Sequence, residues 1–595
     1  MTRTREIILG LNAWHGDAAA CLLVDGRLVA AVEEERFRRV KHWAGFPSEA
    51  VRWCLADAGV EPEELSWIAV NRDPRANLVR KVAFALRHRP SLQLVRDRSR
   101  NAARFGTVEG EVAAALRVPE ASLRAQVARV EHHRAHLASS YLASPFNRAA
   151  LISVDGFGDF SSSAWGVGTG REIEIRGRTF FPHSLGLFYQ ALTQWLGFPK
   201  YGDEYKVMGL AAHGAPRYVD RLRPLAWLDN RGDLRLALEC FQHHTAAVTS
   251  AWNGCEPTQG SVFSAGLERL LGPARRPEDE LDEFHADMAA SVQRYYEELL
   301  FRMLRRLSEQ TGQSDLCLSG GCAMNSLANG RILEETPFER LFVPPAPGDA
   351  GGAVGAALSV WCERLGRQRV FEMDSALLGP SFGDEEIAAL ILRRRDELDA
   401  ADCVVERIED EGELCDRTAA RLAAGDVVGW FQGRMEWGPR ALGNRSILAD
   451  PRRDDMRDVL NTKIKLRETF RPFAPAVLRE EVGSWFDREG DVPFMLQVWP
   501  VRADRHDEVP AVTHADGSGR LQTVEAATNP RFHRLLGAFR RETGVPILVN
   551  TSFNENEPVV CTPEQALNCF LRTRMDCLIV GSWLVRRRPS VAEAA

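Results

Sequence analysis

The pattern that most constrains this chain is an apolar strand that runs into a glycine-rich turn and then a helix N-terminus, and it recurs three times. The three strands are Ala149–Val154, Asp315–Leu318 and one that begins at Leu341. The turns that follow them begin at Asp155, Ser319 and Pro347. Backbone amides and the positive end of a helix dipole attract phosphate at such turns. The pattern therefore predicts an α/β fold with several candidate phosphate loops.

The N-terminal region adds a meander of three short strands, Ile7–Leu11, Ala18–Val24 and Arg27–Val32. Asp25-Gly26 between the last two strands is a strong hairpin signal. Phosphate loops placed after such a meander are typical of the actin-like ATPase architecture. A chain of 595 residues is too long for one hydrophobic core, which predicts two domains, 1–376 and 377–590.

Two histidines and two aspartates form a candidate metal site. His132 and His136 stand four apart on a predicted helix, His132–Ala143, and therefore face the same way. Asp155 and Asp349 are each expected to close a strand. Two imidazoles and two carboxylates suit Fe(II), Mn(II) or a similar divalent ion. The alternative for the aspartates is turn capping, which their glycine neighbours also explain, and His133 is interpreted as structural because it lies on another helix face.

The segment 430–475 concentrates positive charge in a chain whose net charge is −7. Ten Arg and Lys residues lie between Arg434 and Arg471 among Gly, Pro and Trp residues. Cations gathered around tight turns suit a compact polyanion, most simply a phosphate. A solvated surface neutralised by acidic residues such as Asp454 and Asp455 is the alternative.

Two further patterns favour the phosphate interpretation. Lys465 and Arg467, two positions apart, would point to the same side of a strand. Ser552 and Asn554 share that spacing at the end of an apolar run, and they supply a hydroxyl and an amide that can bind phosphate or ribose. The turn-rich loop 514–520 delivers another cation, Arg520.

Composition narrows the function classes. The twelve cysteines lack CxxC spacing, which argues against a zinc ribbon or a disulfide framework and favours a reducing cytoplasm. We expect no membrane span and no signal peptide. The acidic balance weighs against a nucleic-acid partner. The Arg-rich stretch Arg75–Arg104 is interpreted as an exposed helical arm or a flap beside a substrate.

Several motifs together resemble a known family. The segments DGFGD, SGGCAMN and GDAGG, with the HxxxH pair, resemble a Kae1-like domain, and the KxR and SxN pairs resemble a YrdC-like domain. LNAWHGDAAACLL, HSLGLFYQ, GDEYKVMGLAAHG and NTSFN are typical of the nodulation-factor, cephem and aminoglycoside O-carbamoyltransferases. The resemblance runs from Ile8 to about Gly581.

The resemblance implies an ATP-dependent carbamoyl transfer in two steps. The YrdC-like domain would use ATP, with Mg²⁺, and carbamoyl phosphate to form carbamoyl-adenylate. The Kae1-like domain would then pass the carbamoyl group to a hydroxyl of a small molecule, as in antibiotic biosynthesis. The residues implied for phosphate binding are Arg440, Lys465, Arg467, Arg471 and Arg520, with Asn550, Ser552 and Asn554 at the nucleotide end.

In the Kae1-like domain the resemblance implies the metal ligands His132, His136, Asp155 and Asp349, with Fe(II) favoured over Mn or Mg and with both aspartates also catalytic. Gly321 and Asn325, with Gly186 as a weaker candidate, match adenylate-binding positions. His15 would steady the carbamoyl group or accept the acceptor's proton; a loop-ordering hydrogen bond is its alternative role. Lys41 is a further catalytic candidate. Lys41, Asp203, Glu204 and Lys206 lie in family motifs without a defined role.

Two other functions compete with this one. A fused threonylcarbamoyl-adenosine protein that modifies tRNA would need a basic surface, which the acidic balance disfavours. An actin-like small-molecule kinase would leave the second, cation-rich domain unexplained. The acceptor itself, a hydroxyl or an amine, and the choice between monomer and homodimer stay open.

Overall fold

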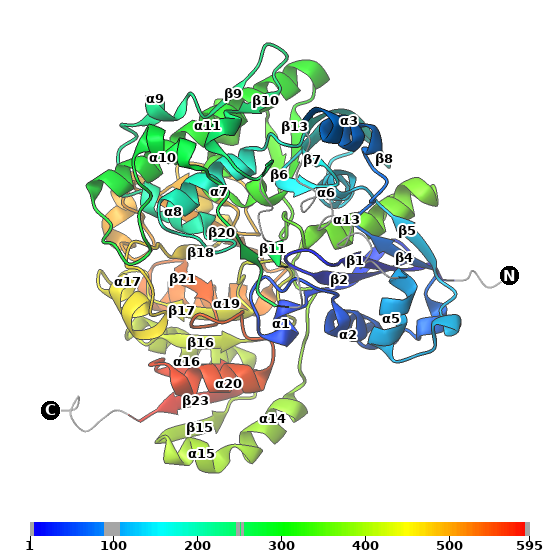
Figure 1. Cartoon of the computed structure of the whole chain (residues 1–595). Coiled ribbons are helices and arrows are strands. Elements are labelled where there is room, and N and C mark those ends of the chain that lie inside the picture. The colour runs from blue at the N-terminus through cyan, green and yellow to red at the C-terminus, as the bar shows by residue number, and fades with distance from the viewer. Residues whose placement is uncertain (1–4, 89–106, 246–249, 252–254, 589–595) are drawn as a thin grey trace. The chain divides into compact units, whose positions relative to one another are not determined.

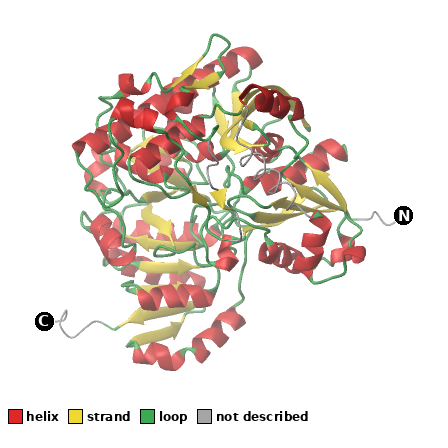
Figure 2. Ribbon diagram, in the orientation of Figure 1, coloured by secondary structure: helices red, strands yellow, loops and turns green. Residues whose placement is uncertain are grey.

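The computed structural model describes residues 5–88, 107–245, 250–251 and 255–588. The chain divides into two compact units, Met1–Met373 and Asp374–Ala595. The predicted domain boundary lies three residues after this division. Both units combine helices with β-sheet (Figures 1 and 2).

The first unit contains two five-stranded sheets with the same strand order. One sheet has the order β3-β2-β1-β4-β5 and the other β8-β7-β6-β13-β14. In each, the three strands of a meander pair antiparallel and two later strands add in parallel. The strands are β1 Ile7–Asn12, β2 Ala19–Val24, β3 Arg27–Glu33, β4 Trp67–Val70, β5 Gln126–Arg129, β6 Arg148–Gly158, β7 Ser161–Thr169, β8 Glu172–Phe180, β13 Asp315–Ser319 and β14 Arg340–Phe342. This duplication confirms the predicted actin-like α/β architecture.

The predicted hairpin is present between β2 and β3. Asp25 has φ 49° and Gly26 has φ 83°, the left-handed values that a two-residue hairpin turn requires. All six residues of β1 are buried. Such a continuous apolar run is expected for a strand covered on both faces.

Two helices, α6 His132–Tyr141 and α13 Gly351–Ser359, pack against each other in the first unit (Figure 1). α6 covers the second sheet and α13 covers the first. Glycines allow the close approach, since a Cβ at Gly355 would lie 1.8 Å from the carbonyl oxygen of Ala135 on α6. A Cβ at Gly10 of β1 would likewise lie 2.2 Å from the carbonyl oxygen of Ala353.

The remaining α-helices of the first unit surround these sheets. They are α1 Glu35–Arg38, α2 Ser48–Ala58, α3 Leu78–His88, α5 Val108–Leu116, α7 Leu185–Trp195, α8 Glu204–Ala211, α9 Val219–Leu222, α10 Ala265–Leu271, α11 Glu283–Thr311 and α12 Ser326–Glu335. α11 is longer than the predicted 291–310, because Asp282 caps a helix start eight residues earlier. No helix among the described residues has the length and apolar character needed to cross a membrane.

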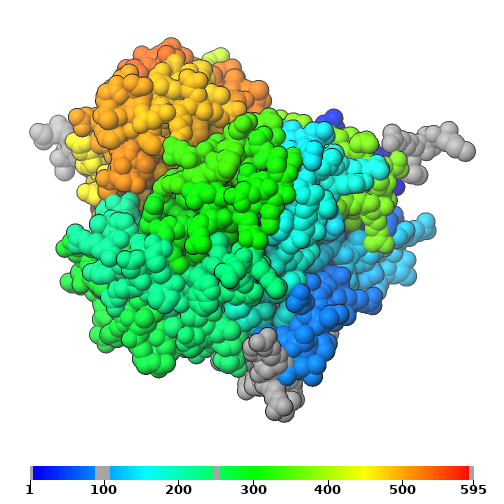
Figure 3. All heavy atoms as spheres, turned by 90° about the horizontal axis from the view of Figure 1, so that it is seen from above, coloured from blue at the N-terminus to red at the C-terminus, as the bar shows by residue number. Residues whose placement is uncertain are grey.

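Part of the predicted arm 75–104 forms α3, and residues 89–106 lie outside the described residues. Several apolar side chains of α3 are exposed, including Val79 at 83% and Leu86 at 76%. The helix lies at the surface of the unit (Figure 3). On its other side, Phe84 packs edge-on against Phe181 with ring centroids 4.9 Å apart.

The second unit is built on one nine-stranded mixed sheet in the order β15-β23-β22-β16-β17-β21-β18-β20-β19. Its strands are β15 Cys403–Arg407, β16 Val428–Phe431, β17 Arg445–Ala449, β18 Ala474–Leu478, β19 Gln497–Pro500, β20 Ser518–Val524, β21 Ile547–Ser552, β22 Cys577–Val580 and β23 Trp583–Arg587. Its α-helices are α14 Asp384–Arg393, α15 Arg395–Ala400, α16 Glu411–Ala423, α17 Met456–Val459, α18 Val482–Trp485, α19 Pro530–Thr543 and α20 Pro563–Arg572. α16 and α19 pack together, and buried residues such as Trp430 and Phe532 form the core.

Candidate functional site

The four predicted metal ligands meet in the first unit. The Nε2 atoms of His132 and His136 lie 3.1 Å apart, and each is 3.1 Å from Oδ2 of Asp155. Oδ1 of Asp349 is 3.6 Å from the first of these nitrogens and 3.5 Å from the second. One ligand atom from each residue lies within 4.8 Å of all the others.

This spacing fits a divalent metal ion. Metal–nitrogen and metal–oxygen bonds of about 2.0–2.2 Å place neighbouring ligands about 3 Å apart. Two imidazoles and two carboxylates form the donor set, which suits Fe(II) or Mn(II). Burial opposes a charge on His136, yet hydrogen bonds to Asp155 and Asp349 raise its pKa to about 9. The two carboxylates therefore favour positive charge at this point, whether it is a proton or a metal ion.

Local backbone geometry presents Asp155 to the histidines. The structure corrects the expectation that β6 ends before Asp155, because the strand continues to Gly158 with an irregular register. Oδ1 of Asp155 accepts the amides of Gly156 and Gly321, at 2.7 and 3.2 Å, which leaves Oδ2 for the imidazoles. A Cβ at Gly158 would lie 2.0 Å from the His132 ring, so this glycine is needed for the contact.

Asp349 reaches the site from a loop. The prediction that it closes a strand is wrong, since β14 ends at Phe342 and Asp349 lies in the turn before α13, two residues ahead of its first residue. Its Oδ2 lies 2.5 Å from Nδ1 of His15, in the loop between β1 and β2. Burial opposes the charge on His15, but Asp349 raises its pKa. The structure therefore brings His15 into contact with the metal group.

Residues that sequence reasoning missed fix the start of α6. Glu131 caps the helix by accepting the amides of His133 and Arg134, and Arg178 donates two hydrogen bonds to the same carboxylate. Oδ2 of Asp159 accepts the His132 amide at 3.0 Å. His133 bonds Ser153, and burial lowers its pKa to about 3, which agrees with a neutral structural role.

The predicted adenylate-binding positions mainly shape the loop after β13. The Gly321 amide bonds Asp155, and a Cβ at Gly186 would lie 2.9 Å from the Asp155 carbonyl oxygen. The Asn325 side chain caps α12 through the Ala328 amide and bonds the Gln293 carboxamide at 3.0 Å. Gly321 and Gly186 thus lie against Asp155, whereas Asn325 fixes the start of α12.

Lys41 lies within electrostatic reach of a second charged group, which includes Glu35 and His42. Burial raises the pKa of Glu35. The charges of Arg36 and, to a smaller extent, Lys41 lower this pKa, and the net result is a pKa below the usual value. Sequence alone gave no signal for this second cluster, in which Nδ1 of His42 lies 2.7 Å from Oδ1 of Asp17.

In the second unit, Lys465 meets the predicted SxN pair, though not from a strand. Residues Leu460–Ile464 form a π-helical turn and Leu466 has φ 45°, so the expected strand spacing is wrong. Nζ of Lys465 nevertheless donates to the Ser552 carbonyl at 2.5 Å and to Oδ1 of Asn554 at 2.7 Å. Neutral oxygens of Ser552 and Asn554 therefore surround the buried Nζ of Lys465.

Three arginines of the second unit form a cation cluster. Burial lowers the pKa of Arg520 well below its ordinary value, and the charges of Arg440 and Arg467 lower it further. Within the described residues, Nε of Arg520 is buried without a hydrogen-bond partner. Like charges gathered at a partly buried place are costly unless an anion binds there.

Buried polar residues hold this cluster in place. Oε1 of Glu436 accepts the amides of Leu442, Asn444 and Arg445, which fixes the loop that carries Arg440. Oδ1 of Asn461 accepts from Nε of Arg467 at 2.8 Å. Sequence reasoning named neither acceptor.

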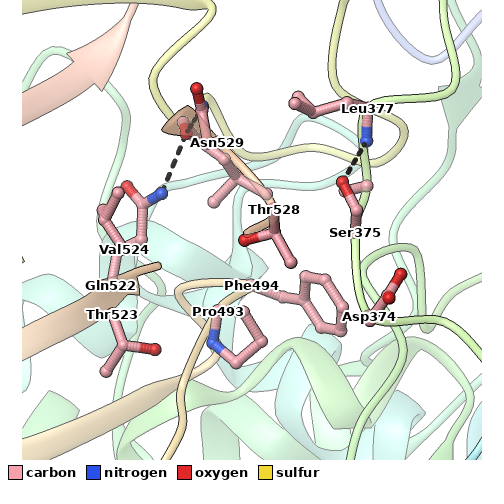
Figure 4. Close-up of a pocket in the computed structure, with 12 residues that line it drawn as sticks. Asp374, Ser375, Leu377, Pro493, Phe494, Gln522, Thr523, Val524, Thr528 and Asn529 are labelled. Atoms are coloured by element: carbon pink, nitrogen blue, oxygen red, sulfur yellow. Dashed lines mark hydrogen bonds between the residues drawn. The ribbon is translucent and has the colours of Figure 1, made fainter. Parts of the chain in front are cut away.

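Asn550 also has a scaffolding role. Its side chain donates to the carbonyl of Ala441 at 3.2 Å and to Oε1 of Gln522 at 2.7 Å. Gln522 in turn donates to the Leu442 carbonyl at 2.9 Å and lines a pocket with Phe494 and Asn529 (Figure 4). These amides tie β20 and β21 to the loop that carries Arg440.

Other cations of segment 430–475 have protein partners. Arg445 is fully buried and donates to backbone carbonyls that include those of Gln432 and Pro380. Arg453 pairs with Asp455 at 2.7 Å, and Arg471 with Glu468 at 2.6 Å. The solvated-surface alternative therefore holds for the exposed Arg453–Asp455 pair, whereas Arg445 is fully buried and Arg471 is 14% exposed.

Comparisons with known proteins agree with this division into two units. Residues 7–358 match the family model described as carbamoyltransferase N-terminus, and residues 419–587 match the carbamoyltransferase C-terminus. The chain is 39% identical to the uncharacterized protein sll1178 of Synechocystis, over 98% of this chain and 96% of that one. It is 37% identical to nodulation protein NolNO of Sinorhizobium fredii, over 98% and 80%, and 30% identical to nodulation protein U of the same organism, over 92% and 93%. The chain therefore belongs to the carbamoyltransferase family.

Proposed function

We propose that this carbamoyltransferase is an ATP-dependent O-carbamoyltransferase that works through carbamoyl-adenylate. The observation that carries the proposal is the presence of two chemically different sites. The second unit gathers cations, and the first gathers imidazoles and carboxylates. We assign activation to a YrdC-like domain, 377–590, and transfer to a Kae1-like domain, 1–376.

The cation cluster suits the activation step. Loss of the donor's phosphate to water leaves carbamate, whose oxygen attacks the α-phosphorus of ATP and displaces pyrophosphate. Arg440, Arg467 and Arg520 offset the repulsion between the two polyanions and stabilise the leaving pyrophosphate, together with the Mg²⁺ that accompanies ATP. Lys465 adds a further cation, which Ser552 and Asn554 orient.

The ligand cluster of the first unit suits the transfer step. His132, His136, Asp155 and Asp349 would hold the divalent ion, Fe(II) by preference and Mn(II) or Mg(II) as alternatives. When bound, such an ion supplies Lewis-acid polarisation of the adenylate. His15, oriented by Asp349, steadies the carbamoyl group.

For the acceptor we propose a hydroxyl of a small molecule, such as a sugar or an antibiotic, and no nucleic acid. The relatives named as nodulation proteins support a specialised small-molecule acceptor. The acidic charge disfavours a tRNA acceptor. We place the reaction in a reducing cytoplasm, where the cysteines stay free thiols.

The test is exchange of radiolabelled pyrophosphate into ATP. Wild-type protein should exchange label only when carbamoyl phosphate is present, because adenylate formation is reversible. A kinase or a nucleotide-sensing scaffold would show no such exchange. Absence of exchange with an active, ATP-bound preparation would remove the proposal.

A further inference from the structure

One short segment, 155–160, contacts the candidate metal ligand His132 at three places. Oδ2 of Asp155 lies 3.1 Å from Nε2 of the imidazole. Gly158 lies against the ring, so closely that a Cβ at this position would be 2.0 Å from it. Oδ2 of Asp159 accepts the backbone amide of His132 at 3.0 Å. The segment therefore holds this residue by a ring nitrogen, by the ring itself and by the backbone.

Asp159 and Glu131 divide the first amides of α6 between them. The amides in the first turn of a helix have no partner within the helix. Glu131 accepts those of His133 and Arg134, whereas Asp159 accepts that of His132. The contacts of Glu131 thus end on residues outside the ligand set, and the contact of Asp159 ends on a ligand.

The backbone is strained at the residue that supplies this oxygen. Asp159 has φ 47° and Phe160 has φ 74°, both in the left-handed region. Asp adopts this conformation more readily than most residues, but a bulky aromatic residue rarely does. The Phe160 ring packs against Phe84 and Phe181, with centroids 5.7 and 5.3 Å away, and its carbonyl accepts the Phe181 amide at 3.1 Å. Such conformations persist only where the surroundings hold them, and they gather at functional sites.

A second segment, 71–77, follows β4 of the first sheet and holds Asp159 in place. The Asp73 amide donates to the same Oδ2 at 2.8 Å. Nδ2 of Asn77 donates to the Asp159 carbonyl at 2.8 Å and to Oγ of Ser161 at 3.2 Å. Both the carboxylate and the carbonyl of Asp159 are therefore bound by one segment.

The start of this second segment supports the loop between β1 and β2. Nδ2 of Asn71 donates to Oδ1 of Asn12 at 3.0 Å. Nδ2 of Asn12 in turn donates to the carbonyls of Gly16 and Asp17, at 3.0 and 2.8 Å. The same loop carries His15. One segment therefore supports this loop at its start and, further along, the carboxylate that holds α6.

We propose that Asp159 is a positioning residue for the metal group, an inference that rests on the metal site of the proposed function. Asp159 acts through the His132 amide: its carboxylate fixes the first residue of α6, and with it the place where the imidazole meets Asp155. Asn77 holds the Asp159 backbone in its left-handed turn. Removing a polar group that orients a metal ligand weakens metal binding about 10- to 100-fold.

The test measures the affinity of the metal-free, full-length protein for Mn(II), with free Mn(II) followed by electron paramagnetic resonance. Asp159→Gly removes the oxygen but adopts the same φ without strain, and it should bind Mn(II) about 10- to 100-fold more weakly than wild type. Asp159→Asn keeps an oxygen that can accept both amides and loses only a negative charge at the helix N-terminus. This conservative variant should stay within about fivefold of wild type.

Asp25→Gly is the matched control. Asp25 also has a left-handed φ, 49°, and its Oδ1 accepts one backbone amide, that of Glu6, at 3.0 Å. The same substitution there removes the same kind of contact from the β2–β3 turn, so it should leave the Mn(II) affinity unchanged. An Asp159→Gly protein that loses stability in urea but binds Mn(II) like wild type would make Asp159 a structural cap only and overturn the proposal.

A double-mutant cycle tests the part of Asn77. Asn77→Gly keeps the left-handed φ of 58° but removes both side-chain hydrogen bonds. It should weaken Mn(II) binding about 2- to 10-fold. Combined with Asp159→Gly it should add little, because the oxygen that it positions is already gone. Fully additive losses would refute the role of Asn77. Should Asp159→Gly fold poorly, Asn77→Gly decides, and an unchanged affinity overturns the proposal.

Two wild-type results separate this inference from the proposed activity. Absence of Mn(II) binding by wild type would overturn the inference together with the metal site. Absence of carbamoyl-phosphate-dependent pyrophosphate exchange, with the Mn(II) affinities as expected, would remove the proposed activity and leave the role of Asp159 at the metal site standing.

Discussion

Replacing Arg520 by Met should stabilise the ligand-free protein while weakening its response to phosphate ligands. Arg520 is partly buried near Arg440 and Arg467, and its lowered pKa shows that the surroundings disfavour its charge. Two like charges about 7 Å apart in an effective dielectric of about 20 repel each other by about 2 kcal/mol before solvent screening. Met keeps most of the apolar stem. We therefore expect a gain of about 1–3 kcal/mol in the free energy of unfolding.

The ligand response should change in the opposite direction. A charge-assisted contact contributes about 1.5–3 kcal/mol, so its loss weakens binding about ten- to a hundredfold. At a pyrophosphate concentration of about 100 Kd, wild type gains about 2.7 kcal/mol. At the same concentration the variant should gain only about 0.4–1.4 kcal/mol, by the same relation.

Urea unfolding with and without inorganic pyrophosphate measures both effects. The chain has two units, so the transition to follow is the one that pyrophosphate shifts in wild type. Arg453→Met, which removes only a surface pair with Asp455, should change stability by less than about 0.5 kcal/mol. A ligand-free Arg520→Met protein that is less stable than wild type, with an unchanged pyrophosphate response, would refute the reasoning.

Three other predictions follow from the two sites. Elemental analysis should find about one Fe(II)-like ion per wild-type chain and less than one in His136→Ala. This variant should lose carbamoyl transfer but keep pyrophosphate exchange. Full transfer by the variant after chelation would contradict the metal assignment. Synthetic carbamoyl-adenylate bypasses activation, so it should restore transfer to Arg471→Ala in the second unit. It should not restore transfer to Asp349→Ala, which lacks a residue of the transfer site. The reverse pattern would contradict the division of activities between the units. The pKa of His42 is raised to about 9 by Asp17 against the opposing effect of burial. The His42–Asp17 pair therefore stabilises the fold fully below about pH 6.5, and this stabilisation is lost as pH rises through 9. In urea unfolding, the free energy of unfolding should fall less steeply at alkaline pH in His42→Gln than in wild type. An unchanged fall would argue against the ion pair.

Local periodicity explains what the sequence could predict. The HxxxH spacing places two imidazoles on one helix face wherever the helix lies, and the expected helix is present as α6. The meander and its Asp25-Gly26 turn are equally local, because the turn chemistry sets the register. The second sheet repeats that topology without a visible sequence repeat, so its equivalence to the first emerged only from the structure.

The failures involve backbone geometry and buried partners. Lys465 was expected on a strand, but a π-helical turn carries it, and burial rather than spacing brings it to Asn554. Asn325 and Asn550 were predicted to hold nucleotide, and the sequence did not show that their side chains also cap α12 and contact Gln522. No pattern in sequence marks Glu436 as the acceptor of three backbone amides, because its partners belong to a loop without periodicity.

The exchange of helices between the two sheets has a consequence for the metal. α6 follows the first sheet along the chain but packs on the second, while α13 follows the second and packs on the first. The imidazoles and Asp155 therefore lie on the half that contains the second sheet, and Asp349 approaches from the turn before the helix that covers the first sheet. An ion bound here would link the two sheet-and-helix halves of the first unit, neither of which supplies a complete ligand set. The metal affinity would therefore depend on the distance between these two halves.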